Sequence, residues 1–300
     1  MQDTIFTVEL PFVETNEKLE KIKAMYPKYD PYFITSGCCK KRKEKFDKLY
    51  EEFKPYADKH FLTEVKTNFH QRSWEMYVGN VLLSKKIIIQ SKNEGPDFVI
   101  DKVAYIECVA PTKGDPTKSD SVPEILVATK PEEICVQDVP VDKMILRITQ
   151  TIKDKALGQY ENWKSKKWFD SKIPFLIAVN TVDLEYPQDY LGIPLIIKAL
   201  FGLQFLQIDQ DGNKSFSWIN EIKKQSGYSV PVNYFTNCDY NFVSGIIFSD
   251  KTVLNHPDNI GDDCIFVNNP FAKNPIKNNF ISLFKNWKAE IKGILQKNYS

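Results

Sequence analysis

Hydrophobic and polar positions early in the chain follow the spacing of amphipathic helices. Residues 16–25 and 41–53 carry this pattern, and Pro27 and Pro31 lie between them. Proline ends or interrupts a helix, so two separate helices are expected here.

A longer helix is predicted for residues 62–84. Its apolar side chains recur at i, i+3, i+4, i+7 and i+8, as on a helix that faces a core; they are Trp74, Tyr77, Val78, Val81 and Leu82. Glu75 lies at the edge of this stripe. Gly79 lies one turn further on, where the missing side chain lets another group approach closely.

The pattern then changes to β-branched and alternating residues. Residues 86–90 form a short β-branched run and predict a strand. Residues 97–100 and 103–110 are apolar runs joined by the polar pair Asp101-Lys102, which predicts a β-hairpin.

Helices and strands alternate in the rest of the chain. Residues 111–139 contain four prolines, which favours a long loop. The elements expected after it are a helix over 141–168, strands over 175–179, 245–248 and 264–267, and a C-terminal helix over 279–296. This order predicts an α/β fold with a central mixed β-sheet flanked by helices. We assign residues 1–62 to an N-terminal helical extension and 63–300 to the α/β domain.

Composition and charge exclude few classes of protein. Of 300 residues, 42% are hydrophobic and 26% charged, as in globular proteins. The net charge is +1, so nucleic-acid binding would need a local basic patch. The run Lys40-Lys41-Arg42-Lys43 is one candidate, although a solvated helix face is the favoured interpretation.

The chain has no pattern of a secretory signal or of a membrane span. Its first residues lack a basic and an apolar region, which predicts a cytoplasmic protein without deciding against signal-independent secretion. The six cysteines form no C-x-x-C pair and no zinc-like spacing with histidine, so we expect reduced, mostly buried thiols. Abundant lysine and asparagine are typical of an AT-rich bacterial genome.

Two carboxylates of the predicted hairpin are candidate ligands for a cation. Glu107 shares a strand face with Tyr105 and Val109, where burying a charge is costly without a partner. Asp97 starts the other strand directly after Pro96, and the hairpin can bring it beside Glu107. Because two close carboxylates repel each other, a divalent cation is the natural counter-charge.

This region resembles the PD-(D/E)XK superfamily, the restriction-endonuclease-like nucleases. The matching residues are Pro96-Asp97, a nine-residue gap, and Glu107-Cys108-Val109, with Glu75 on the preceding helix. The resemblance covers roughly residues 64–180. It implies a restriction-endonuclease-like core and hydrolysis of phosphodiester bonds in DNA or RNA, with Mg²⁺ or Mn²⁺ held by Glu75, Asp97 and Glu107.

One position departs from the family pattern, because Val109 stands where the family has a lysine. The helix over 141–168 offers a substitute, since Lys155 and Gln159 lie near the centre of its apolar stripe. Two orientations are open. Both side chains could point into the acidic cluster, or Lys155 could extend its amine into solvent at the edge of the buried face. Arg147 is off the stripe and ranks lower, and Lys113, in the loop after the motif, is another possible substitute.

Other roles are open for each acidic residue. Glu75 can pair with Arg72 one turn earlier, and Asp97 can cap a turn. The three histidines, His60, His70 and His256, share no metal-like spacing. The alternative function is a nuclease-like fold that has lost hydrolysis and binds nucleic acid or a protein partner, with Val109 as its main support.

Overall fold

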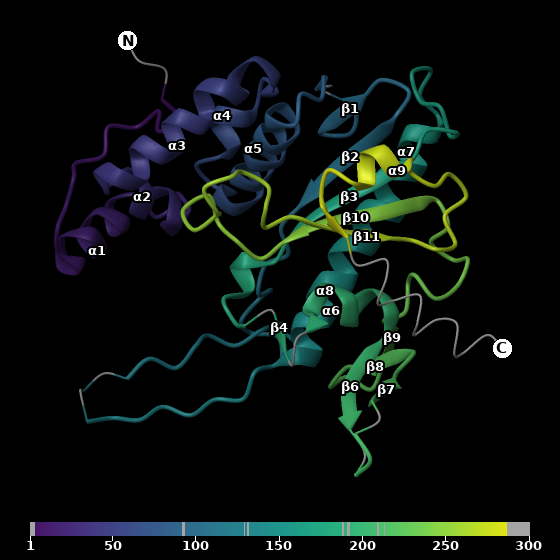
Figure 1. The fold of residues 1–300 in the computed structure, drawn as a ribbon. Helices are drawn as coiled ribbons and strands as arrows, with labels where there is room; N and C mark the ends of the chain where they lie inside the picture. The colour runs from purple at the N-terminus through teal and green to yellow at the C-terminus, as the bar shows by residue number, and fades with distance from the viewer. Residues whose placement is uncertain are drawn as a thin grey trace.

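A six-stranded mixed sheet lies at the centre of the molecule (Figure 1), in the order β1-β2-β3-β10-β11-β12. The computed structural model describes residues 4–91, 94–128, 130, 132–187, 189–190, 193–208, 210–212 and 214–286. The strands are β1 (Phe98–Ile100), β2 (Ala104–Val109), β3 (Phe175–Asn180), β10 (Val243–Ser249), β11 (Ile265–Asn268) and β12 (Lys285–Asn286). The α/β class and the mixed sheet flanked by helices are confirmed.

Strand direction changes across the sheet. The predicted hairpin is confirmed, because β1 and β2 are antiparallel. The next three strands, β2, β3 and β10, are parallel neighbours, and β11 returns antiparallel to β10. All residues of β2, β3 and β10 are buried, as expected for parallel strands covered on both faces.

One face of the sheet is covered by the helices between residues 16 and 84. These helices are α1 (Asn16–Met25), α2 (Pro31–Gly37), α3 (Lys40–Phe53), η1 (Lys54–Tyr56), α4 (Phe61–Glu64) and α5 (Phe69–Ser84). They share one core with strand residues such as Ile106 and Leu176. In Figure 1 they gather on one side of the sheet, with α5 beside it.

The helix predicted over 62–84 is in fact two helices. Helix α4 ends at Glu64, and Asn68 has non-helical backbone angles (φ −130°, ψ 56°) directly before α5. The Asp30 carboxylate accepts a hydrogen bond from the backbone N–H of Phe69 at 3.1 Å. This distant side chain supplies the cap that satisfies the first turn of α5, so a new helix begins there.

Gly79 allows close packing inside α5, as the sequence predicts. A Cβ at this position would lie 2.6 Å from the Phe53 ring and 3.2 Å from that of Phe98. Both rings are fully buried, so neither has free space to move into.

We expect Gly79→Val to lower the free energy of unfolding by about 1–3 kcal/mol, the usual cost of overpacking a core. Urea denaturation measures this change. Gly158→Ala is the matched control, because a Cβ there meets no atom within 4 Å. An unchanged urea midpoint for Gly79→Val would show that the core is looser than described.

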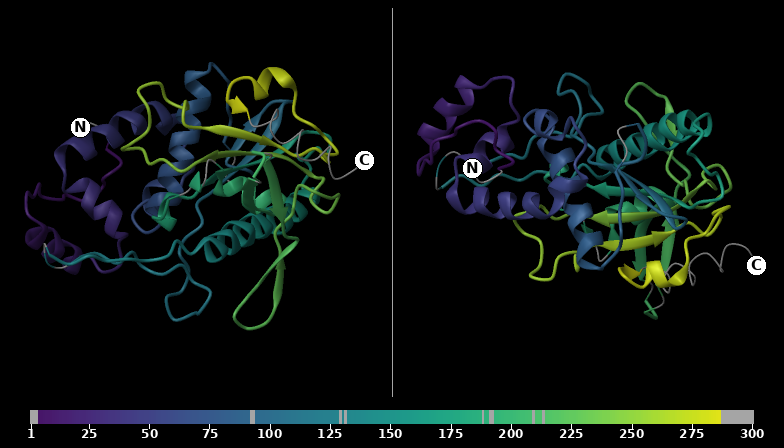
Figure 2. Two further views of the ribbon diagram at one scale, coloured as in Figure 1. Left: turned by 60° about the horizontal axis from the view of Figure 1, so that its bottom comes forward. Right: turned by 90° about the horizontal axis from the view of Figure 1, so that it is seen from above.

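The opposite face is covered by α6 (Val141–Lys153), a π-helical segment η2 (Asp154–Gln159), α7 (Tyr160–Lys164) and α8 (Leu195–Phe201). The first three run continuously, so the helix predicted over 141–168 is correct except that it contains a π segment and ends at Lys164. Strand residues Tyr105, Val109 and Ile177 join the core on this face. Figure 2 shows the two helical layers on either side of the sheet.

Smaller elements surround this core. They are η3 (Val182–Leu184), β4 (Asp189–Tyr190), β5 (Ile193–Pro194), β6 (Leu203–Ile208), β7 (Lys214–Trp218), β8 (Glu221–Lys223), β9 (Ser229–Pro231) and α9 (Asn278–Ile281). The described part of the predicted loop over 111–139 contains no helix or strand and extends away from the body (Figure 1). In the described residues no helix is long and apolar enough to span a membrane.

Two predicted elements are wrong. Residues 86–90 do not form a strand: Lys86 has φ 60°, and only Gln90 bridges to Val99. The helix predicted over 279–296 ends at Ile281, after which Lys285–Asn286 pairs with β11. Its remaining positions, 287–296, lie outside the described residues. All six cysteines are free, and Cys38, Cys108 and Cys264 are buried whereas the others are at least partly exposed.

Candidate functional site

The hairpin places Asp97 opposite Glu107. Phe98 pairs with Ile106, so one further step of the antiparallel register aligns the two acidic residues. The Asp97 carboxylate accepts a hydrogen bond from the backbone N–H of Cys108 at 2.7 Å. This bond holds Asp97 against the edge of β2, beside the strand that carries Glu107.

Glu107 is buried on the face of β2 that it shares with Tyr105 and Val109, as predicted. The residue is only 4% exposed. Its Oε1 lies 2.7 Å from Lys155 Nζ, whereas its Oε2 is buried and has no hydrogen-bond partner. A buried carboxylate oxygen without a partner is costly and points to a missing ligand or ion.

Lys155 reaches the cluster from the π-helical segment η2. Its side chain is 31% exposed, so the aliphatic part packs while the amine contacts Glu107. Of the two orientations left open by the sequence, the structure shows the one that points into the acidic cluster. Gln159 ends the same segment and is partly exposed; across the described residues it makes no hydrogen bond to the acids.

Helix α5 brings Glu75 close enough to Asp97 that the charge of Asp97 raises the pKa of Glu75. Gln71, one turn earlier, donates to the Cys108 carbonyl at 2.7 Å and accepts from the Ala110 N–H at 2.8 Å. These two bonds fix α5 to the edge of β2, and Glu75 follows on the same side of the helix. Glu75 is 1% exposed.

Glu75 also has the cationic partner that the sequence allowed. Arg72 Nη1 lies 2.5 Å from Glu75 Oε2 and 3.2 Å from Asp58 Oδ2. The same guanidinium also pairs with Glu64. One arginine therefore contacts three carboxylates, of which only Glu75 belongs to the acidic cluster.

Burial makes these carboxyl groups hard to ionise. It raises the pKa of Glu75 and of Glu107 to about 8, and the negative charge of Asp97 adds to both shifts. Arg72 and Lys155 oppose the shifts without cancelling them. Burial also raises the pKa of Asp97, although the Cys108 N–H lowers it in part. Asp97 thus acts on the pKa of both glutamates.

These raised pKa values predict that the metal-free protein loses stability as the pH rises. Between the ordinary glutamate pKa of about 4.3 and about 8, the folded chain keeps protons that the unfolded chain releases. We expect a fall in melting temperature of about 4 °C or more from pH 5 to pH 8, measured by calorimetry. Glu107→Gln should show a smaller fall. Equal falls in both proteins would contradict a raised pKa at Glu107.

The residues fit a divalent cation in chemistry. Hard carboxylate oxygens suit Mg²⁺ or Mn²⁺, and the unpartnered Glu107 Oε2 is available to one. Within the described ranges, however, no group of three or more His, Cys, Asp or Glu side chains is placed to hold a metal ion. The Arg72–Glu75 pair is one physical reason, since it draws Glu75 toward the guanidinium. Asp97 and Glu107 are therefore the first candidate ligands, with Glu75 third.

The other proposed lysine substitutes lie elsewhere. Lys113 pairs with Glu124 and Glu185, each at 2.5 Å. Arg147 donates to the Thr112 carbonyl at 2.8 Å. Both are bound outside the acidic cluster, so Lys155 is the described amine that contacts it.

Gln71 is the site residue that sequence reasoning missed. Its spacing of four residues before Glu75 is a usable signal, because positions i and i+4 share a helix face. Nothing local reveals that its amide fits two backbone groups of β2, since that contact depends on how α5 packs on the sheet. The sequence likewise does not reveal that Asp58 and Glu64 pair with Arg72.

Comparisons with models of known families, with curated proteins and with solved structures find no significant match to this chain.

Proposed function

We propose that this protein is a metal-dependent nuclease that hydrolyses phosphodiester bonds in DNA or RNA. The observation that carries the proposal is the contact of 2.7 Å between Lys155 Nζ and Glu107 Oε1. It supplies, from a neighbouring helix, the amine that Val109 lacks in the resembling motif. The site thus places Asp97, Glu107 and Lys155 together, with Glu75 beside Asp97 as a third carboxylate.

The order of elements supports a restriction-endonuclease-like core. Helix α5 carries Glu75, the bridge at Gln90 precedes β1, and β1 and β2 form the antiparallel hairpin with the acidic pair. The crossover through α6 then leads to β3, parallel to β2. Topology alone does not determine function, whereas the groups at the site define which chemistry is possible.

Each group has a chemical task in this proposal. Asp97 and Glu107, with Glu75, would hold Mg²⁺ or Mn²⁺, which lowers the pKa of water and neutralises charge on the phosphate. Lys155 holds a positive charge beside Glu107, where it orients the attacking water or stabilises charge on the phosphate oxygens. Asp97 is only partly buried, so a phosphate group could approach it from this edge of the hairpin.

Cleavage assays test the proposal directly. The protein is incubated with Mg²⁺ or Mn²⁺ and with single- and double-stranded DNA and RNA, and a matched reaction contains EDTA. We expect cation-dependent cleavage, and its loss in the Asp97→Ala/Glu107→Ala double variant. Cleavage that survives in this variant would show that the proposed site is wrong.

A second function, binding without hydrolysis, is favoured by the ion pair of 2.5 Å between Arg72 and Glu75. In that case the buried charges serve the fold, and the molecule binds nucleic acid or a protein partner. Salt-sensitive nucleic-acid binding without cleavage in any cation would favour this alternative.

A further inference from the structure

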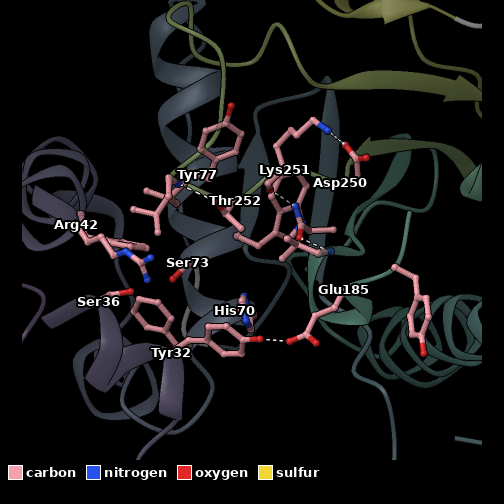
Figure 3. A pocket seen from close by; sticks show the side chains of 18 of the residues that line it. Tyr32, Ser36, Arg42, His70, Ser73, Tyr77, Glu185, Asp250, Lys251 and Thr252 are labelled. Atoms are coloured by element: carbon pink, nitrogen blue, oxygen red, sulfur yellow. Dashed lines mark hydrogen bonds and ion pairs between the residues drawn. The ribbon is translucent and has the colours of Figure 1, made fainter. Parts of the chain in front are cut away.

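A cavity of about 480 Å³ lies on the other side of α5 from the acidic cluster. It is bounded by α5, by the N-terminal helices α2 and α3, and by the chain that follows β3 and β10 (Figure 3). His70, Ser73, Trp74 and Tyr77 of α5 face this cavity, whereas Glu75 does not line it. The cavity is therefore separate from the proposed nuclease site.

Its position in the sheet is one that binds ligands in many open α/β folds. Asn180 is the last residue of β3 and Asp250 follows the last residue of β10, and both line the cavity. These strands are parallel, so the cavity lies outside their carboxyl ends, where crevices form between diverging connections. Its volume is in the range of small-molecule sites.

Ser73 marks the polar end of the cavity. The residue is 6% exposed, and its Oγ is buried without a hydrogen-bond partner. A serine inside a helix usually donates to the carbonyl four residues earlier, so an unpartnered hydroxyl here is unusual. His70 Nε2 also lacks a hydrogen bond, although Asp183 Oδ1 lies 3.4 Å away. Both side chains line the cavity, where a ligand oxygen would satisfy the Ser73 hydroxyl.

The charge balance of the lining favours an anion. Glu185 is already bonded to Tyr32 and to Lys113, and Asp250 lies 3.1 Å from Lys251 Nζ. Arg42 of α3 makes no ion pair within the described chain. Figure 3 shows its guanidinium on the same side of the cavity as the Ser73 hydroxyl. An arginine and a hydroxyl together bind phosphate or carboxylate oxygens.

The remaining walls are aromatic. Phe46 and Trp74 are buried, and Trp74 stacks with Tyr77 at a ring-centroid distance of 5.8 Å. Tyr32 closes another side, where its ring lies edge-on to His70 at 4.3 Å. Such walls favour a flat ring, which buries its faces and stacks on them.

We propose that this cavity binds a small aromatic anion, with its ring between the aromatic walls and its phosphate or carboxylate at Arg42 and Ser73. A mononucleotide and an aromatic carboxylic acid share this chemistry. The proposal does not depend on nuclease activity, because no member of the acidic cluster lines the cavity.

Calorimetric titration of the full chain tests it with five probes. Adenosine monophosphate and phenyl phosphate represent the phosphate source, and benzoate the carboxylate source. Adenosine and inorganic phosphate each carry only half of the required chemistry. We expect saturable binding of at least one of the first three, and at least about tenfold weaker binding of adenosine and of inorganic phosphate than of the tightest of these three. Binding of none of the three overturns the proposal.

Variants locate the bound molecule. Arg42→Ala and Ser73→Ala should each weaken binding by about tenfold. The matched control is Lys41→Ala, which removes the same charge from the neighbouring exposed position of α3 and should leave the affinity unchanged. Glu107→Gln should also leave it unchanged. Equal affinity in wild type, Arg42→Ala and Ser73→Ala overturns the proposal, as does binding lost only in Glu107→Gln.

Discussion

Glu107→Gln lowers the rate of cation-dependent cleavage by about a hundredfold or more in our account. Glutamine keeps the shape of the side chain and can still accept a hydrogen bond from Lys155, but it removes the negative charge. The Oε2 atom of Glu107 is buried and has no hydrogen-bond partner, so it is the carboxylate oxygen that a cation would bind. Single-turnover cleavage at saturating enzyme measures the change.

A surface variant controls for this experiment. Glu161 is also paired with a lysine, Lys164, at 2.5 Å, but its side chain is 54% exposed. Glu161→Gln therefore removes a lysine-paired carboxylate of the same kind and should leave cleavage unchanged. If Glu107→Gln cleaves as fast as Glu161→Gln, Glu107 has no part in the chemistry.

Lys155→Ala is expected to lower kcat by about 10²–10³-fold with little change in KM. The reason is that Lys155 acts on the reacting phosphate or water beside Glu107, whereas binding of the polymer depends on contacts spread over a wider surface. Lys155→Arg keeps the positive charge and should recover part of the rate. Steady-state kinetics at several pH values separates the effects on kcat and KM.

The matched control is Lys164→Ala, one helical element further along, where the lysine pairs with Glu161 at the surface. A raised KM with unchanged kcat in Lys155→Ala would mean that Lys155 only contributes to binding. Full activity in Lys155→Ala would assign the 2.7 Å contact to stability of the fold.

The hairpin and its acidic pair were predictable from local signals. Two apolar runs around Asp101-Lys102 define the register, and that register aligns Asp97 with Glu107. The burial of Glu107 followed from its apolar neighbours Tyr105 and Val109. These features depend on residues close in the chain, where alternation and turn chemistry determine structure.

The rest of the site depends on contacts between distant segments. The contact of Lys155 with Glu107 joins residues 48 positions apart, and the sequence left its direction open. The break before α5 comes from Asp30, which lies 39 positions from Phe69. The failed strand over 86–90 has the right composition, but Lys86 takes a left-handed backbone angle after α5, and only Gln90 of this run pairs with the sheet. Tertiary packing overrides local propensity in each case.

Titration with Mn²⁺, followed by electron paramagnetic resonance, tests most directly whether the carboxylates beside Lys155 hold a cation. The account predicts saturable Mn²⁺ binding by the wild-type protein, with proton release at pH 7, because the pKa values of Glu75 and Glu107 are raised in the metal-free state. It predicts that Asp97→Asn/Glu107→Gln loses this binding while remaining folded. Identical Mn²⁺ binding by the two proteins, or none by the wild type, would contradict it.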